Sequence, residues 1–223
     1  MQLNLSKKII FYFFLIIFLS TFNNKYIKKI ELKSVDNVTI IGLDESEKQD
    51  LMNDLKLLRS KNIFFLDKSE IVNKLDENKI IENYTIFKKY PSSLEIRVNK
   101  TKFLANVFSD GNFFLLGSNG KLIKSKKKNN NLPNIFGDYD KESFFNLLKS
   151  MNKSNFKLSE IKNLYYFKSG RWDLETNLGI MIKLPKNDLE NFLNLSLSII
   201  DDDKFEKIKI LDLRQNNQVI ING

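Results

Sequence analysis

The chain has 223 residues, of which 42% are apolar, and a formal net charge of +9. This length accommodates one large domain or two small ones behind a targeting segment, with enough apolar residues for ordinary cores. Because cysteine and histidine are both absent, the composition excludes thiolate nucleophiles, imidazole bases, disulfide frameworks and most zinc sites.

The first predicted element is an apolar segment near the N-terminus. Residues 9–22 carry no charge and directly follow Lys7 and Lys8. A helix of that length covers about 21 Å, less than the hydrocarbon core of about 30 Å. Extension to residues 3–22, with both lysines reaching the headgroups, gives the length that a span requires. We therefore expect residues 1–24 to comprise a short cytoplasmic tail and a transmembrane anchor.

Two other interpretations of this segment remain open. Its apolar length fits a cleaved signal peptide, although residues 20–24 contain no small-x-small cleavage site. A buried helix of a soluble protein is the second, although the segment is apolar on every face. Lysines flank the segment on both sides, so their distribution does not determine its orientation.

Residues 25–100 contain the first predicted folded unit. The apolar pattern of residues 27–41 indicates an extended segment. Residues 45–58 then place three leucines at helical spacing, and Asp44 or Ser46 is suited to cap this helix.

The same unit continues with a second helix and two strands. Asp67 and Glu70 have the spacing of a capping box at the start of the helix. Residues 81–88 and 94–98 follow as strands, and apolar and charged residues alternate in the second of them. The predicted order is therefore β-α-α-β-β.

Residues 101–223 are predicted to form a second unit of short strands and two helices. A helix is expected around residues 144–151, and another begins at Asn187 or Asp188. The expected strands are 104–107, 113–116, 121–123, 161–167, 171–175, 180–184, 208–213 and 218–221. The fold class is therefore α+β with largely antiparallel strands.

The positive charge is concentrated in one short region. Residues 101–137 carry six basic residues and one acidic residue, and most of the lysines lie in residues 121–128. A surface that follows phosphates would distribute basic residues along an element and interleave them with aromatics. This pattern favours a solvated loop, and we expect no nucleic acid partner.

No catalytic, cofactor or metal site is predicted. Ser-x-x-Lys occurs five times, as chance allows in a chain rich in both residues, without the other motifs of penicillin-binding enzymes. Three consecutive carboxylates at residues 201–203 cannot all face one ion and indicate a solvated turn. Trp172, Phe144 and Phe145 are interpreted as core aromatics.

Six motifs, in this order along the chain, resemble the FtsQ/DivIB family of bacterial cell division proteins. They are residues 62–67 (NIFFLD), 89–98 (KYPSSLEIRV), 117–120 (GSNG), 132–137 (LPNIFG), 170–174 (GRWDL) and 212–214 (DLR). Three positions depart from the family pattern. Leu43 follows Gly42 where Asn is common, Asn99-Lys100 replaces Glu-Arg, and Gln215 stands where an aromatic often follows the Asp-Leu-Arg motif.

The resemblance implies a POTRA domain over residues 25–100 and a C-terminal β-domain over residues 101–223. It also implies a single-pass, type II protein of the cell inner membrane with its body in the periplasm at the division septum. There it would act as a divisome scaffold that binds FtsB and FtsL, not as an enzyme. In the family, the last strand of the β-domain accepts a strand from FtsB, which is β-augmentation.

We place the expected partner-binding site at the C-terminal edge strand. Few residues follow this strand to cover it, and its apolar residues lack the Lys or Pro that usually protects an edge. The arginine of the Asp-Leu-Arg motif could pair with a carboxylate of the partner. The candidate residues are Arg214, Gln215, Asn217, Val219, Ile220 and Ile221.

Two other classes of function are compatible with the predicted fold. A POTRA-containing chaperone or assembly factor for outer-membrane or secreted proteins is the first, and tandem POTRA repeats would be expected for it. An anchored periplasmic enzyme is the second, and it would need a nucleophile-base pair that the sequence does not indicate.

Overall fold

The computed structural model describes residues 3–21, 34–202, 208–215 and 218–223. The chain divides into two compact units, residues 1–75 with residues 84–98, and residues 76–83 with residues 99–223. Residues 27–33 of the extended segment predicted over residues 27–41 lie outside the described residues, and residues 37–41 form a strand.

The N-terminal segment is helical. Helix α1 covers Leu3–Thr21, and the apolar side chains from Ile9 to Leu19 are exposed. Among the residues that the structure describes, no helix combines the length and apolar character needed to cross a membrane. The helical conformation predicted for this segment is confirmed, whereas the transmembrane span predicted over residues 3–22 is not.

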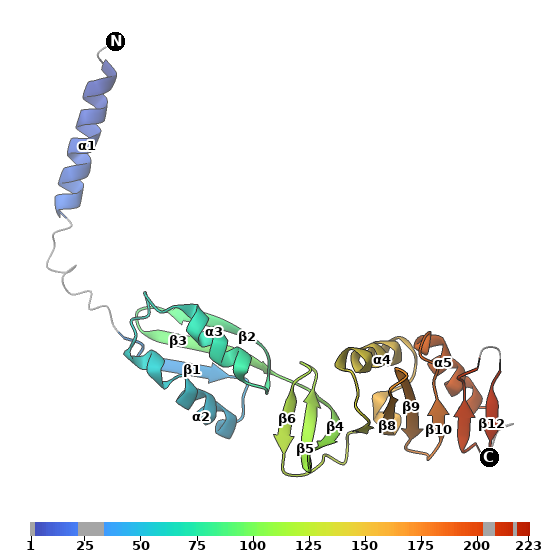
Figure 1. The fold of residues 1–223 in the computed structure, drawn as a ribbon. Coiled ribbons are helices and arrows are strands. Elements are labelled where there is room, and N and C mark those ends of the chain that lie inside the picture. The colour runs from blue at the N-terminus through green and yellow to red at the C-terminus, as the bar shows by residue number, and fades with distance from the viewer. Residues whose placement is uncertain (1–2, 22–33, 203–207, 216–217) are drawn as a thin grey trace. The chain divides into compact units, whose positions relative to one another are not determined.

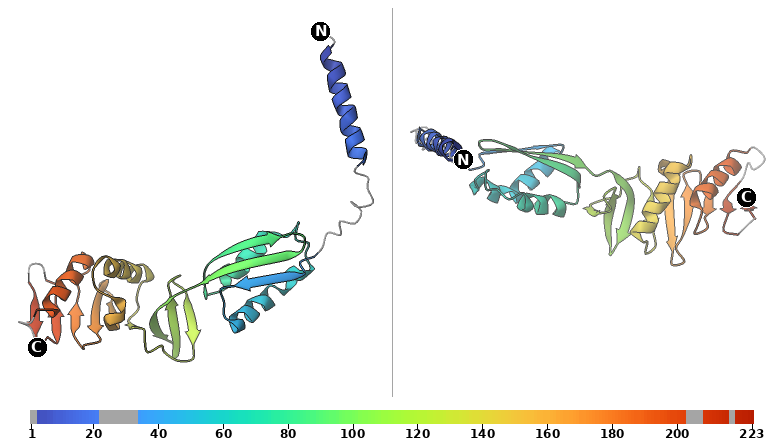
Figure 2. Two further views of the ribbon diagram at one scale, coloured as in Figure 1. Left: turned by 180° about the vertical axis from the view of Figure 1, so that it is seen from behind. Right: turned by 90° about the horizontal axis from the view of Figure 1, so that it is seen from above.

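A three-stranded sheet with the order β1-β3-β2 forms the first unit. Both of its helices lie on one face of the sheet (Figure 2). The elements are β1 (Asn37–Ile41), α2 (Glu45–Asp54), α3 (Lys68–Glu77), β2 (Ile81–Lys89) and β3 (Ser93–Lys100). Strand β1 pairs in parallel with β3, and the predicted order β-α-α-β-β is confirmed.

The two predicted helix starts differ in outcome. Asp44 caps α2, and its backbone N–H donates to the Glu47 carboxylate at 3.2 Å. Asp67 does not form the predicted capping box with Glu70, because its carboxylate accepts from the backbone and hydroxyl of Ser69 at 2.9 and 2.5 Å. Glu70 pairs with Lys61 instead.

The helix predicted over residues 45–58 is interrupted. Helix α2 ends at Asp54, and a 3-10 helix, η2 (Lys56–Ser60), follows. This tighter turn still buries Leu55 and Leu58. The apolar spacing therefore predicted the buried side chains correctly and the backbone form incorrectly.

The second unit is built on a nine-stranded sheet with the order β12-β11-β10-β9-β8-β7-β4-β5-β6. Most neighbours are antiparallel, and the pairs β4–β7, β7–β8 and β10–β11 are parallel. The strands are β4 (Phe103–Ser109), β5 (Asn112–Gly117), β6 (Leu122–Ser125), β7 (Asn134–Phe136), β8 (Ile161–Phe167), β9 (Arg171–Thr176), β10 (Met181–Lys183), β11 (Ile210–Asp212) and β12 (Ile220–Asn222).

Helices α4 (Lys141–Lys153) and α5 (Leu189–Ile200) lie side by side over one face of this sheet (Figure 1). A short 3-10 helix, η3 (Leu158–Glu160), precedes β8. The core beneath them includes Trp172, whose indole N–H donates to the Ser143 hydroxyl at 3.0 Å. The fold class is α+β and mostly antiparallel, as predicted.

Strand β7 was not predicted. It has three residues and directly follows Pro133, so it is too short to show an alternating pattern. Its position is set by parallel pairing with β4 on one side and β8 on the other. Both partners are distant in sequence.

Candidate functional site

Strand β12 is the terminal strand of the nine-stranded sheet. It pairs antiparallel with β11, in the register Ile210 with Asn222, Leu211 with Ile221 and Asp212 with Ile220. Among the described residues, no strand pairs with its other side. An edge of this kind presents backbone N–H and C=O groups that can accept a partner strand.

The hydrogen bonds of β11 show which backbone groups of β12 face outward. Leu213 N–H donates to the Lys183 carbonyl at 2.9 Å, so the odd-numbered residues of β11 face β10. The even-numbered residues then face β12, and their partners Ile220 and Asn222 face β11 in return. The backbone groups of Ile221 therefore point to the free edge.

The predicted site residues divide into three groups. Val219 and Ile220 are 40% and 41% exposed, and Gln215 is also exposed. Ile221 is half-buried and packs against the core. Asn217 lies outside the described residues. The edge thus offers two accessible apolar side chains beside one that anchors the strand.

Arg214 has a partner within the chain. Its Nε donates to Asp212 Oδ1 at 2.7 Å, its backbone N–H donates to the same oxygen at 3.1 Å, and a second guanidinium nitrogen contacts Oδ2. These hydrogen bonds lower the pKa of the Asp212 carboxyl. The guanidinium remains partly exposed, so contact with an incoming carboxylate requires that Arg214 be shared with Asp212.

A row of charged residues leads from the sheet interior to this edge. The register places Asp173 of β9 beside Lys183 of β10, and Lys183 beside Asp212 of β11. Asp173 also accepts from Arg171 Nε at 3.2 Å. Burial nevertheless raises the pKa of the Asp173 carboxyl, because desolvation outweighs the nearby positive charges.

Sequence reasoning placed Asp173 and Asp212 within family motifs, but it assigned neither of them, nor Lys183, to the candidate site. A signal was present in the spacing, because an arginine and an aspartate two residues apart occur at both Arg171 and Arg214. Residues two apart on a strand share a face. The cross-strand position of Lys183 could not be predicted without the strand pairing.

The opposite edge of the same sheet has a different character. Strand β6 carries the exposed Lys124, and the exposed residues 126–128 that follow are all lysines. Charged side chains, lysine above all, deter strand addition. Of the two edges, the β12 edge is therefore the one suited to accept a strand.

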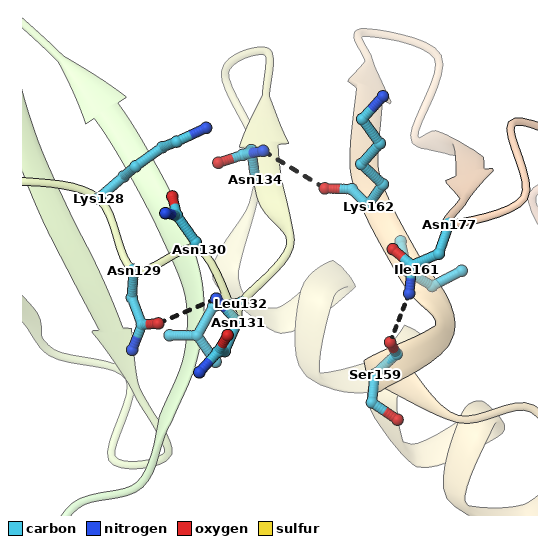
Figure 3. A pocket seen from close by; sticks show the side chains of 10 residues that line it. All are labelled: Lys128, Asn129, Asn130, Asn131, Leu132, Asn134, Ser159, Ile161, Lys162 and Asn177. Atoms are coloured by element: carbon cyan, nitrogen blue, oxygen red, sulfur yellow. Dashed lines mark hydrogen bonds between the residues drawn. The ribbon is translucent and has the colours of Figure 1, made fainter.

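A polar pocket of 540 Å³ is a second candidate (Figure 3). Most of its polar groups are already bonded within the chain. Asn134 Nδ2 donates to Asn163 Oδ1 at 2.8 Å, Asn177 Nδ2 donates to the Ser159 carbonyl at 2.8 Å, and Lys162 pairs with Glu175. The pocket therefore retains few groups to hold a ligand.

Comparisons with known proteins identify both units. The family model "Cell division protein FtsQ/DivIB, C-terminal" matches residues 105–214, and the model "POTRA domain, FtsQ-type" matches residues 33–100. A solved structure, the major extracytoplasmic domain of the trans isomer of the cell division protein DivIB from Geobacillus stearothermophilus, is 17% identical with a TM-score of 0.33. The match covers 42% of this chain and 85% of that one. No curated protein matches.

Proposed function

Because this chain belongs to the FtsQ/DivIB family of cell division proteins, we propose that it is a non-catalytic scaffold that binds FtsB and FtsL in the periplasm through the β12 edge. The observation that carries this proposal is the edge itself. It is unpaired among the described residues, it is uncharged over residues 219–221, and the backbone of Ile221 faces outward.

An added strand would continue both rows of side chains that cross the sheet. Its residue beside Ile221 would extend the buried row that includes Leu211 and Ile182. Its residue beside Ile220 would lie on the opposite face, with Ile220 between it and the Asp212–Arg214 pair. An FtsB strand that fits is therefore apolar at the first position, and a carboxylate at the second can share Arg214.

Residues 1–24 serve in this proposal as a short cytoplasmic tail and the anchor of a type II inner-membrane protein. Exposed apolar side chains from Ile9 to Leu19, directly after Lys7 and Lys8, support that role. Residues 25–100 and 101–223 then form the POTRA domain and the β-domain in the periplasm at the septum.

Depletion of the protein in its native host tests the proposed role. We expect filamentation, midcell localisation of a fluorescent fusion, and digestion of the body by protease added to spheroplasts. Normal division after depletion would refute the scaffold role. A protease-protected body, or recovery of the chain in the soluble fraction, would refute the proposed anchor and topology.

A further inference from the structure

A row of aromatic side chains crosses four adjacent strands of the nine-stranded sheet. The register pairs Phe113 of β5 with Phe108 of β4, and Phe136 of β7 with Tyr165 of β8. The parallel pairing of β4 with β7 places Phe108 beside Phe136. Because the alternate residues of these strands are buried beneath α4 and α5, the aromatic row lies on the other face.

The row borders an apolar groove. Phe108 and Phe136 are 59% and 45% exposed, and together with Phe113 they line a recess of 400 Å³. Lys128 and Asn134 also line this recess. A recess of this size accommodates one or two apolar side chains of a partner.

Packing within the sheet accounts for only part of the row. Phe136 stacks on Tyr165 with 5.2 Å between ring centroids, and the Tyr165 hydroxyl donates to Glu175 at 3.0 Å. Such cross-strand pairs stabilise a sheet. The ring centroids of Phe108 and Phe113 are 5.0 Å apart, but the larger part of the Phe108 side chain remains in water. Packing within the sheet therefore does not account for an aromatic residue at position 108.

Lysines border the groove on its β6 side. Lys126, Lys127 and Lys128 are exposed, and within the described residues none of the three pairs with a carboxylate. Ser125 of β6 pairs with Phe113, so these lysines directly follow the end of the aromatic row. An apolar groove beside unpaired cations complements an apolar segment that carries carboxylates.

We propose that this groove, formed by Phe108, Phe113, Phe136 and Lys128, is a second docking site that binds an acidic protein segment through an inserted aromatic or aliphatic side chain. The recess is concave, which suits an inserted side chain, whereas a bilayer surface requires protruding ones. Strands β11, β10, β9 and β8 separate the groove from β12. The site is therefore independent of the proposed edge interaction.

Fluorescence anisotropy with designed peptides tests this site. The full-length chain in nanodiscs of zwitterionic lipid is titrated into a labelled peptide that carries one phenylalanine and one leucine, each flanked by glutamates. One control peptide has lysine in place of glutamate, and another has serine in place of the apolar residues. Phe136→Ser and Lys128→Glu are compared with the matched variants Leu178→Ser and Lys149→Glu, which change exposed residues outside the groove.

We expect saturable binding of the acidic apolar peptide only, weakened about tenfold by Phe136→Ser and about fivefold by Lys128→Glu. Lys128→Glu should also improve binding of the lysine peptide, which a merely unfolded variant would not do. Leu178→Ser and Lys149→Glu should bind as the wild type does. Binding of the serine peptide with equal affinity, or equal weakening by the matched variants, would overturn the proposal. If anionic lipid nanodiscs competed with the acidic peptide for the groove and bound it more tightly, the groove would be a membrane-facing surface and the proposal would be overturned.

Discussion

Arg214 and Asp212 form a bidentate ion pair next to the free edge of the β-domain sheet. The pair connects the Asp-Leu-Arg motif to the end of a charged row that also includes Asp173 and Lys183. Asp212 lies beside Ile220 in the register. In any strand added to β12, the residue beside Ile220 is therefore separated from this pair by one strand only.

Reversal of the charge at Arg214 should weaken FtsB binding. Arg214→Glu removes the cation that an incoming carboxylate can share and places a second carboxylate beside Asp212. We expect a loss of about five- to tenfold at low salt and a smaller loss at high salt, because part of the interaction is screened. Titration of an immobilised FtsB periplasmic segment at two salt concentrations measures both.

Arg59→Glu is the matched control for this experiment. Arg59 is exposed in the first unit, so the substitution makes the same change in net charge away from β12. If Arg59→Glu weakened binding as much as Arg214→Glu, the effect would come from net charge and not from the edge.

The two aspartates of the charged row should respond oppositely to pH. The pKa of Asp212 is lowered in the folded state, so its contribution to stability is present above the unfolded value of about 4 and is lost as pH falls through the lower folded value. The difference in Tm between wild type and Asp212→Asn should therefore shrink on acidification.

For Asp173 the sign is reversed, because burial raises its folded-state pKa. The folded state then takes up a proton before the unfolded state does, so wild type gains stability relative to Asp173→Asn as pH falls. Melting curves of wild type and both variants between about pH 2 and pH 7 check this, because that range brackets the ordinary carboxyl pKa of about 4. Parallel pH profiles for the two variants would contradict the assignment.

Gly137 should not tolerate a side chain. Its φ is +94°, and a Cβ there would lie 2.3 Å from the Tyr166 carbonyl oxygen. We expect Gly137→Ala to lower the free energy of unfolding by about 3 kcal/mol or more, from strain and overlap together. Gly111 also has a positive φ, +73°, but open space around it. Gly111→Ala should therefore cost only about 1 kcal/mol, and equal losses in denaturant melts would contradict this.

Asn106 should hold the lysine-rich loop in place. Its buried side chain donates to the carbonyls of Asn129 and Leu132 at 2.8 and 2.9 Å, and accepts from the Asn129 N–H at 2.7 Å. Asn106→Leu removes all three bonds and leaves the Asn129 carbonyl only the Leu132 N–H, at 3.2 Å. The substitution should cost about 3 kcal/mol, with faster tryptic cleavage at residues 126–128. Asn130 is exposed on the same loop, so Asn130→Leu should change neither quantity.

The sequence predicted most elements of both units because their side-chain periods are local. The burial of the apolar residues Leu94, Ile96 and Val98 and the cap at Asp44 each depend on neighbouring residues, and both appear in the structure, although Glu95 between them is buried as well. The two family models confirm the family that the six motifs indicated. One departure from the family pattern leaves a backbone constraint unchanged. Leu43 follows Gly42 where Asn is common, but a Cβ at Gly42 would still lie 1.9 Å from the Val98 carbonyl oxygen.

Features that depend on strand order were not predictable in the same way. Strand β7 and the aromatic row require β4 and β8 to flank residues 134–136, and these strands are distant in sequence. The intrachain partner of Arg214 could be inferred from the spacing of two residues. The direction of the Ile221 backbone could not, because it follows from the hydrogen bonds between β10 and β11.

The most direct test of the central claim compares Ile221→Pro with Ile221→Ala in binding to FtsB. Both substitutions reduce the side chain, but only proline removes the outward-facing N–H. Affinity for the FtsB periplasmic segment is measured by titration of the full-length chain in nanodiscs, with circular dichroism to confirm folding. We predict that Ile221→Ala binds within about threefold of wild type and that Ile221→Pro binds at least about tenfold more weakly. Equal affinities of the two folded variants would show that FtsB does not add a strand at β12.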